Sequence, residues 1–449
     1  MSTIKSRRGL NVPIHGAASS LDVHTTPATS HVALLPQESW GIKVKMLAQV
    51  GDAVKLGTPL FCDRRDEAAV FGSPGAGKLV AVNRGHRRSV LSVVIELDHR
   101  EEHEDFQVCD PSKTSAEDLR KALLYSGLWP VLRQRPYDKV ANSEAQPSAL
   151  IVTASDTRPL APSPLAVIAG RETEFKYGLA VLAKLCGAPT WLCHAAGEDW
   201  NHLLSEGVRA QGFGGPHPSG TAGYQIHKLA PVGPQRSTWH VGYQDVADVG
   251  QLFMTGKQPT ERVIALVGPV MREPRLLRTR RGADLAPLCK GEYEAAQPRV
   301  VSGSLLEGMI CEPGSATGYL GRYANQVSIM EGRTDRELLG WVKPVAGRFT
   351  QTNTLLDKFF RSRFKFDADA NGGLRAIVPA GMYEKVMPLD ILPTQLIKAL
   401  ASNDLENAEK LGVLEIAEED LALCQFVDPS KQPLTDMLRT MLTRIEKEG

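Results

Sequence analysis

A strand–helix–strand pattern in the middle of the chain restricts the possible folds more than any other feature of the sequence. Residues 149–154 read ALIVTA, an apolar run of strand length, and residues 190–194 form a second short strand pattern. One face of the helix expected over residues 171–186 is apolar and consists of Phe175, Leu179, Leu182 and Cys186. Buried strands that alternate with amphipathic helices are typical of a parallel sheet. We therefore predict a Rossmann-like α/β domain over residues 101–255.

Residues 1–100 contain short apolar runs separated by glycine-rich turns, which indicates an all-β unit. The phrases VGDAVKLGTPLF (50–61) and SPGAGKLVAV (73–82) resemble the biotinyl/lipoyl-like barrel-sandwich fold. Carriers of that fold present one lysine at a hairpin tip, because their prosthetic group is attached to an amine. No lysine occurs between Lys55 and Lys78, and the tip region 63–67 reads DRRDE. We therefore predict a docking module rather than a carrier.

The second half of the chain predicts two further domains. Two strand patterns, 261–268 and 273–282, precede a short helix that begins near Asp284. We predict a small β-grasp (SLBB-like) domain with a hairpin extension over residues 256–380 and a helical domain over residues 381–449. The fold class is thus multidomain α+β, because one hydrophobic core rarely serves more than about 300 residues.

The last helix is expected to begin after Pro433 and to carry one apolar stripe. The stripe consists of Leu434, Met437, Leu438, Met441, Leu442 and Ile445. We favour packing of this stripe inside its own domain over a groove that faces a partner.

Composition argues against several classes of protein. The formal net charge is +1, so no broad basic surface points to nucleic acid. No apolar stretch approaches the roughly 18 residues that a membrane-spanning helix needs, and residues 1–9 lack the apolar core of a secretory signal. The seven cysteines are scattered, which favours reduced thiols in the cytoplasm over disulfides.

No motif for a metal ion or an iron-sulfur cluster is found, because such centres need closely spaced thiolates. Cys186 and Cys193 are seven residues apart in separate expected elements, and Cys424 has no second thiol nearby. We interpret the histidines as polar or surface residues in preference to metal ligands, and no G-x-S-x-G turn suggests a hydrolase.

Two other segments allow more than one interpretation. The glycine-rich loop 212–223 could expose backbone N–H groups to a phosphate, but glycine also serves tight turns and two prolines interrupt the loop. We favour the structural interpretation of this loop. A basic cluster consists of Arg272, Arg275, Arg278, Arg280 and Arg281. We interpret it as the solvated side of a strand in preference to a contact for an acidic partner.

Long runs along the whole chain resemble the A subunits of the sodium-translocating NADH:quinone reductases. The runs are RRGLNVPIHG (7–16), SGLWPVLRQRPYDKV (126–140), GPHPSG (215–220), VSGSLLEG (301–308), YLGRYANQ (319–326), VPAGMYEKVMPLDILPTQLIKAL (378–400) and LGVLEIAEEDLALCQFVDPSK (411–431).

The resemblance implies a peripheral subunit on the cytoplasmic side of the bacterial inner membrane, without a transmembrane segment. Its expected partners are subunits B to F of the complex, and it is expected to contact the membrane-embedded B subunit directly. The resemblance also implies that ubiquinone is the substrate, which the complex reduces while it exports Na+. The FAD, FMN, riboflavin and iron-sulfur centres are expected in the other subunits, and none in this chain.

The chain is also similar in domain order to the flavin-binding subunit of respiratory complex I and to the C subunit of the Rnf complex. Those relatives have an FMN-cradling glycine loop and a cysteine-rich cluster motif. Residues 126–139 stand where the glycine loop is expected, and their bulky side chains predict that it is filled. The cluster region keeps only Cys424, and Asp428 stands where many family members have a second cysteine.

We predict that this protein helps to shape a quinone site, which needs apolar ring contacts and donors to the quinone carbonyls. The candidate residues are Trp129, Arg135, Tyr137, Tyr319 and Arg322. Two alternatives stay open: a purely structural docking subunit with quinone bound by the membrane subunits, and a working flavoprotein like the distant relatives.

Overall fold

A seven-stranded sheet carries the α/β part of the protein in the computed structural model, which describes residues 3–26, 28–332, 349 and 362–448. The first five strands in spatial order are parallel, and the last two are antiparallel additions at one edge. In spatial order they are β1 (Thr3–Lys5), β14 (Val208–Gly214), β13 (Thr190–Ala195), β12 (Leu150–Ala154), β15 (Thr238–Gly242), β10 (Arg133–Arg135) and β11 (Lys139–Val140).

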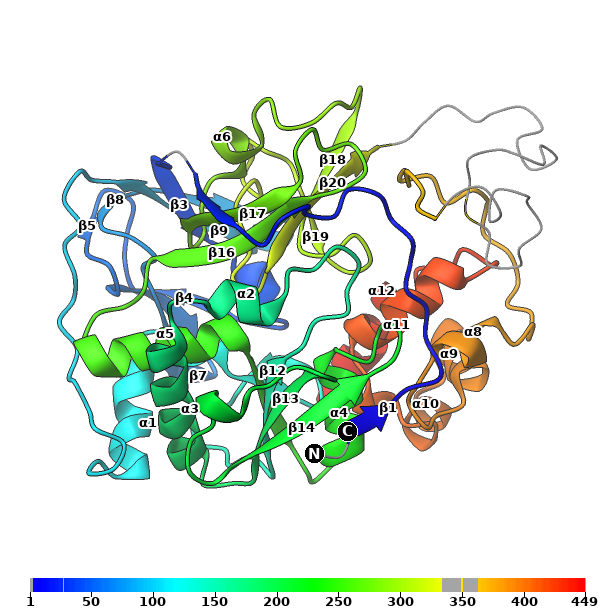
Figure 1. Ribbon diagram of the computed structural model, residues 1–449, viewed down its shortest axis with the longest axis horizontal. Helices are drawn as coiled ribbons and strands as arrows, with labels where there is room; N and C mark the ends of the chain where they lie inside the picture. The colour runs from blue at the N-terminus through cyan, green and yellow to red at the C-terminus, as the bar shows by residue number, and fades with distance from the viewer. Residues whose placement is uncertain (1–2, 27, 333–348, 350–361, 449) are drawn as a thin grey trace.

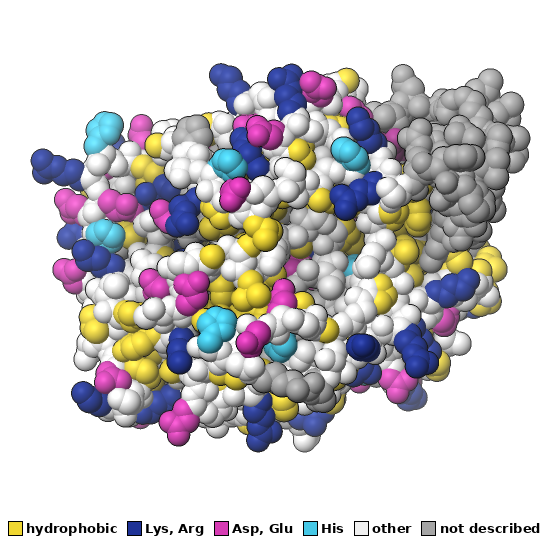
Figure 2. Space-filling model, viewed as in Figure 1, with side chains coloured by type: hydrophobic (Ala, Val, Ile, Leu, Met, Phe, Trp, Pro, Cys, Tyr) yellow, Lys and Arg dark blue, Asp and Glu magenta, His cyan; other side chains and the backbone are white. Residues whose placement is uncertain are grey.

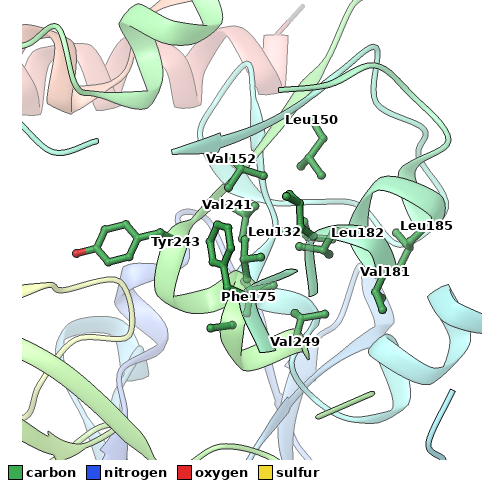
Figure 3. Close-up of a cluster of buried hydrophobic side chains, with 14 of the residues drawn as sticks. Leu132, Leu150, Val152, Phe175, Val181, Leu182, Leu185, Val241, Tyr243 and Val249 are labelled. Atoms are coloured by element: carbon green, nitrogen blue, oxygen red, sulfur yellow. The ribbon is translucent and has the colours of Figure 1, made fainter. Parts of the chain in front are cut away.

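Alternate side chains of this sheet enter two different cores, because successive residues of a strand point to opposite faces. Leu150 and Val152 of β12 lie in the core on the face covered by α1, α3 and α5, part of which Figure 3 shows. Ile151, between them, packs on the other face against α4 and the C-terminal helices. The helices of the first face are α1 (Ala116–Tyr125), α2 (Pro164–Ile168), α3 (Glu172–Cys186) and α5 (Tyr243–Thr255).

The second face is covered by α4 (Ala222–Leu229) and by five helices from the end of the chain (Figure 1). These are α8 (Met382–Val386), α9 (Pro393–Ser402), α10 (Leu405–Lys410), α11 (Glu418–Val427) and α12 (Leu434–Glu448). The apolar stripe predicted for the last helix is buried in this core, apart from the partly buried Met437, so its packing inside the molecule is confirmed.

A six-stranded mixed sheet lies above the α/β part in Figure 1 and forms the β-grasp region. Its strands in spatial order are β19 (Met309–Cys311), β18 (Pro298–Ser302), β20 (Gln326–Glu331), β16 (Glu261–Val267), β17 (Arg275–Arg280) and β2 (Val23–Thr25). Helix α6 (Leu285–Cys289) begins at Asp284, whose side chain accepts a hydrogen bond from the N–H of Ala286, as the sequence predicted.

Two small antiparallel sheets form the N-terminal barrel-sandwich. One contains β3 (His31–Leu34), β9 (Val90–Leu97), β8 (Gly77–Arg84) and β5 (Ala53–Val54), and the other contains β4 (Val44–Met46), β6 (Pro59–Asp63) and β7 (Asp66–Gly72). Short 3-10 turns complete the described elements: η1 (Pro36–Glu38), η2 (His86–Arg88), η3 (Trp129–Val131), η4 (Asn201–Leu203) and η5 (Val413–Glu415).

Residues 3–25 connect the parts of the molecule. β1 pairs with β14 of the large sheet, and β2 pairs with β17 of the β-grasp sheet, so this segment crosses from one layer to the other (Figure 1). The division of the chain at residues 100, 255 and 380 stays a prediction.

Candidate functional site

A cavity of about 270 Å³ opens at the carboxyl ends of β12 and β15. After β12 the chain builds β13 and β14 on one side, and it then returns to place β15 on the other side of β12. In open α/β sheets such a reversal leaves a crevice between neighbouring strands, which is the usual ligand position. The cavity is therefore the first candidate for a functional site.

All four parts of the chain line this cavity. The lining residues include Glu38 and Trp40 from the N-terminal part; Thr153, Ser155, Asp156, Arg158, His240 and Tyr243 from the α/β part; Ser302, Glu307, Tyr323 and Gln326 from the β-grasp part; and Glu418 and Glu419 from α11.

Arg158 is the ionic centre of the cavity wall. Its guanidinium lies 3.3 Å from Asp156 and 2.6 Å from Glu419, and it also pairs with Glu307. Burial alone would lower the pKa of Arg158, but these carboxylates raise it, so the side chain stays charged. Three segments far apart in the sequence thus meet through one cation.

A second cation, Arg135, lies behind the wall and is 1% exposed. Its guanidinium nitrogens lie 2.7 Å from Glu419, 3.1 Å from Asp420 and 3.3 Å from Asp138. Asp138 also pairs with Arg133 and lies 2.8 Å from Nε2 of His240. Burial lowers the pKa of His240, although Asp138 opposes that shift.

Carboxylates of α11 close the start of helix α4. Glu419 accepts a hydrogen bond of 2.9 Å from the N–H of Gly223, and an added Cβ on Gly223 would lie 2.0 Å from Oδ1 of Asp420. A helix N-terminus is the usual place for a phosphate group. Here the chain's own negative charge occupies that position, and the nearby cations Arg135 and Arg158 are already paired.

Burial raises the pKa of Asp420 to about 7, against the effect of Arg135. Burial would likewise raise the pKa of Glu419, but Arg158 and Arg135 lower it. The ionised carboxylate at the start of α4 is therefore Glu419.

Three polar groups on the cavity wall have no hydrogen-bond partner among the described residues: the hydroxyls of Tyr243 and Thr153 and one carboxylate oxygen of Glu307. Tyr243 is 2% exposed, and its hydroxyl points away from the apolar cluster in Figure 3. Burial raises the pKa of Tyr243, so the hydroxyl stays protonated and can donate. Because an unpartnered buried polar group is costly, the two hydroxyls are candidates to bind a carbonyl oxygen.

Glu38 brings an ionisable group to the cavity from the N-terminal part. One of its carboxylate oxygens accepts a hydrogen bond of 3.0 Å from the N–H of Arg322. Burial raises the pKa of Glu38 to about 7, although Arg322, Arg133 and Arg262 oppose the shift. The folded protein therefore binds a proton here that the unfolded chain releases near pH 4.5.

Glu38→Gln is expected to remove one component of the pH dependence of stability. In the wild type, the contribution of Glu38 to the free energy of unfolding is complete below pH 4.5. It is lost as the pH rises to about 7, because ionisation of this carboxyl group is disfavoured only in the folded state. The free energy of unfolding of the variant, relative to that of the wild type, should therefore increase by up to about 3 kcal/mol as the pH rises from 4.5 to 8. Denaturant midpoints at several pH values measure the gain, with the exposed Glu96→Gln as control. Parallel profiles for wild type and Glu38→Gln would contradict the assignment.

The five residues predicted for a quinone site are not gathered in one place, and none of them lines this cavity. Trp129 is fully buried, donates from its indole N–H to the carbonyl of Ala141 at 2.7 Å, and packs edge-on against Trp239. Arg135 belongs to the ion network described above.

The other three candidates are partly buried. The carbonyl of Tyr137 accepts a hydrogen bond from Arg439. Tyr319 forms an isolated bridge with Asp284, and Arg322 contacts Glu38 through its backbone N–H. Their role in a quinone site stays a prediction.

The basic cluster of β17 is matched by acids of the same chain. Arg272, Arg275, Arg278 and Arg280 pair with Glu294, Glu292, Glu261 and Glu101, respectively. The interpretation as a solvated strand face is wrong for Arg281, which is buried and donates to the carbonyl of Pro259 at 3.0 Å. Burial lowers its pKa to about 9.

The seven cysteines are free, as the scattered spacing predicted, and all of them are buried. Among the described residues, no three His, Cys, Asp or Glu side chains group as a metal ion requires. In the same part of the chain, every helix falls short of the length and apolarity needed to cross a bilayer.

Sequence reasoning missed most of the cavity wall, although a signal was present. Asp156 and Tyr243 lie within two residues of the ends of the buried strands β12 and β15, and parallel strands bring their carboxyl ends to the same edge. Glu38, Glu307 and Glu419 had no comparable local signal, because distant segments bring them to the cavity.

Three family models match successive parts of the chain. They describe an NqrA N-terminal barrel-sandwich hybrid domain (residues 4–98), an NqrA second alpha/beta domain (residues 114–258) and an NQRA C-terminal domain of SLBB type (residues 263–312). The predicted fold class is thereby confirmed.

Full-length relatives share 44% of their residues with this chain. Proteins named as the A subunit of the Na(+)-translocating NADH-quinone reductase, from Neisseria gonorrhoeae (strain NCCP11945) and Yersinia pestis, match over 450 residues, which cover 99% of this chain and 100% of each relative. A solved chain of an NAD+-reducing [NiFe]-hydrogenase in the air-oxidized state aligns with 76% of this chain and 68% of its own length, at 14% identity and a TM-score of 0.35.

Proposed function

The chain belongs to the NqrA family, the A subunits of the Na(+)-translocating NADH-quinone reductase, an enzyme complex, and from this we propose that it is a peripheral subunit without a redox cofactor of its own. It acts on the cytoplasmic side of the membrane and has no catalytic activity alone. The closed start of helix α4 carries the proposal, since Glu419 and Asp420 occupy a helix N-terminus, which is the kind of position that binds a phosphate group.

The electron carriers then belong to the partners. We propose that FAD, FMN, riboflavin and the iron-sulfur centre are held by subunits B to F, and that this chain contacts the membrane-embedded B subunit. The assembled complex passes electrons from NADH to ubiquinone and couples this reaction to Na+ export. The surroundings of Cys424 support the absence of a cluster in this chain, because no three His, Cys, Asp or Glu side chains of the described residues are gathered as a metal centre requires.

The purified chain is accordingly expected to be colourless and free of iron. Absorbance in the flavin bands and an iron assay test this directly on the full-length protein. Stoichiometric flavin or iron would contradict the proposal and support the flavoprotein alternative.

We also propose that the cavity contributes to binding the quinone head group. The hydroxyls of Tyr243 and Thr153 can donate to the two carbonyl oxygens, and Tyr323 and Trp40 supply aromatic wall. The residues predicted from the sequence then support this wall from behind or from its rim. They are Trp129, Arg135, Tyr137, Tyr319 and Arg322.

Tyr243→Phe in the assembled complex is expected to raise KM for a short-chain ubiquinone about fivefold with kcat unchanged, since one hydrogen bond contributes about 1 kcal/mol. Steady-state kinetics at saturating NADH measure the change. Tyr125→Phe is the matched control, because this tyrosine is 73% exposed on α1 and lies outside the cavity.

Kinetics identical to the wild type for Tyr243→Phe would overturn the quinone contribution and leave the second candidate, a purely structural docking subunit. The paired charges of the cavity wall favour that candidate, because they stabilise contacts among the α/β part, the β-grasp part and α11. Omission of the chain from the complex would then abolish assembly while the flavins of the other subunits remain.

A further inference from the structure

The hairpin between β8 and β9 ends in an exposed basic tip, residues 84–89, with the sequence RGHRRS. Arg84, His86, Arg87 and Arg88 are all exposed. In the part of the chain that the structure describes, none of the three arginines forms an ion pair, and their only side-chain hydrogen bond runs from Arg84 to the carbonyl of Arg88 at 3.1 Å.

This lack of partners distinguishes the tip from the basic cluster of β17, where four arginines pair with glutamates of the same chain. The chain has a formal net charge of only +1, so the tip is a local concentration of charge and not part of a basic surface. Figure 2 likewise shows charges of both signs interspersed over one face of the molecule. Three neighbouring cations without a partner favour an external anion.

The backbone of the tip is constrained as well. Arg87 and Arg88 have φ values of 53° and 60°, a left-handed conformation that L side chains rarely adopt. Two successive residues of this kind are costly, and such conformations concentrate at sites where shape serves a function.

The chemistry of the tip favours a lipid surface over a protein. Stable protein interfaces contain a desolvated apolar or aromatic centre, whereas residues 84–89 include no apolar side chain. Anionic headgroups require only cations that reach the interface, and each arginine near them strengthens binding about fivefold.

We propose that the tip of the β8–β9 hairpin docks on the anionic phospholipid headgroups of the membrane. This proposal rests on the proposed function in one respect, namely that the complex is membrane-bound. The tip then fixes the orientation of the N-terminal part beside the bilayer, without insertion.

Co-sedimentation of the full-length chain with vesicles tests the proposal. The wild type should bind vesicles that contain phosphatidylglycerol, should not bind vesicles of phosphatidylcholine alone, and should dissociate as salt is added. The triple variant Arg84→Gln/Arg87→Gln/Arg88→Gln should lose about 100-fold in affinity, from the fivefold contribution of each arginine.

The matched control is Arg272→Gln/Arg278→Gln/Arg280→Gln, which removes the same charge from paired arginines and should keep vesicle binding. Thermal melting of each variant identifies a folding defect. Absence of wild-type binding, or equal loss in both variants, would overturn the proposal. Normal vesicle binding by the tip variant together with weakened assembly of the complex would also overturn it, in favour of an acidic protein partner. Flavin or iron in the purified chain would contradict the proposed function itself, and this result is independent of the vesicle measurements.

Discussion

Arg135→Ala is expected to destabilise the α/β part by about 3–5 kcal/mol, the usual cost of removing one partner from a buried ion network. The guanidinium is 1% exposed and contacts Glu419, Asp420 and Asp138. Glu419 and Asp138 would keep Arg158 and Arg133 as partners, but Asp420 would lose its cation. The structure would then hold an uncompensated carboxyl group with no access to water.

The loss should depend on pH, because a carboxyl group that has lost its cation favours the protonated form. Its folded-state pKa rises further above the unfolded value, so the destabilisation should be largest above pH 7 and smaller at pH 5. Denaturant unfolding followed by tryptophan fluorescence reports on this region, since Trp129, Trp200 and Trp239 are buried in the core of the large sheet.

Arg278→Ala is the control for Arg135→Ala. Arg278 pairs with Glu261 at 2.9 Å, but both side chains are more than a third exposed, and a pair of this kind contributes about 0.5 kcal/mol. Arg135→Lys should fall between the two, because one ammonium group cannot contact three carboxylates. Equal losses for Arg135→Ala and Arg278→Ala would show that the buried network contributes little to stability.

Local periodicity was enough to predict the elements on which the α/β part is built. The expected helix 171–186 is α3 (Glu172–Cys186), and its predicted apolar face is buried. Ser115 begins α1 by accepting a hydrogen bond from the N–H of Asp118, an N-cap that involves neighbouring residues alone. These features depend on residues within a few positions of one another, which is why the sequence alone reveals them.

The candidate site depends on contacts that no local pattern contains. The partners of Arg135 on α11 lie 284 and 285 residues later in the chain. Arg135 lies in residues 126–139, which stand where the glycine loop of the distant relatives is expected, and this position suggested a binding role. Its contacts with α11 indicate a structural role in addition. The strands β10 and β11 were also missed, because Arg133–Arg135 and Lys139–Val140 are short and mostly polar.

The packing of α3 on α5 was equally hidden from the sequence, although two glycines permit it. An added Cβ on Gly178 of α3 would lie 1.9 Å from the carbonyl oxygen of Val246, and one on Gly250 of α5 would lie 1.7 Å from the carbonyl oxygen of Glu174. Both obstacles are helix backbone, so relief requires that one helix moves as a body. The two helices pack against each other, and Figure 1 shows both to the left of β12, β13 and β14.

Gly250→Ala is therefore expected to destabilise the protein by about 2–3 kcal/mol, as overpacking of a dense core does. The gain of about 1 kcal/mol that alanine brings to a helix interior opposes this loss, so the sign of the result shows which effect is larger. The same fluorescence-detected unfolding measures the change. Gly233→Ala is the control, since no heavy atom lies within 4 Å of the added Cβ, and it should be neutral or slightly stabilising.

The double variant Gly178→Ala/Gly250→Ala separates a shift of the whole helix from two local clashes. If α5 moves away from α3 to admit one methyl group, the second methyl group finds part of its space already open, and the combined loss should be smaller than the sum of the single losses. Strictly additive losses would mean that each clash is relieved locally. A stabilised Gly250→Ala variant would mean that the close approach of the two helices is not required for this core.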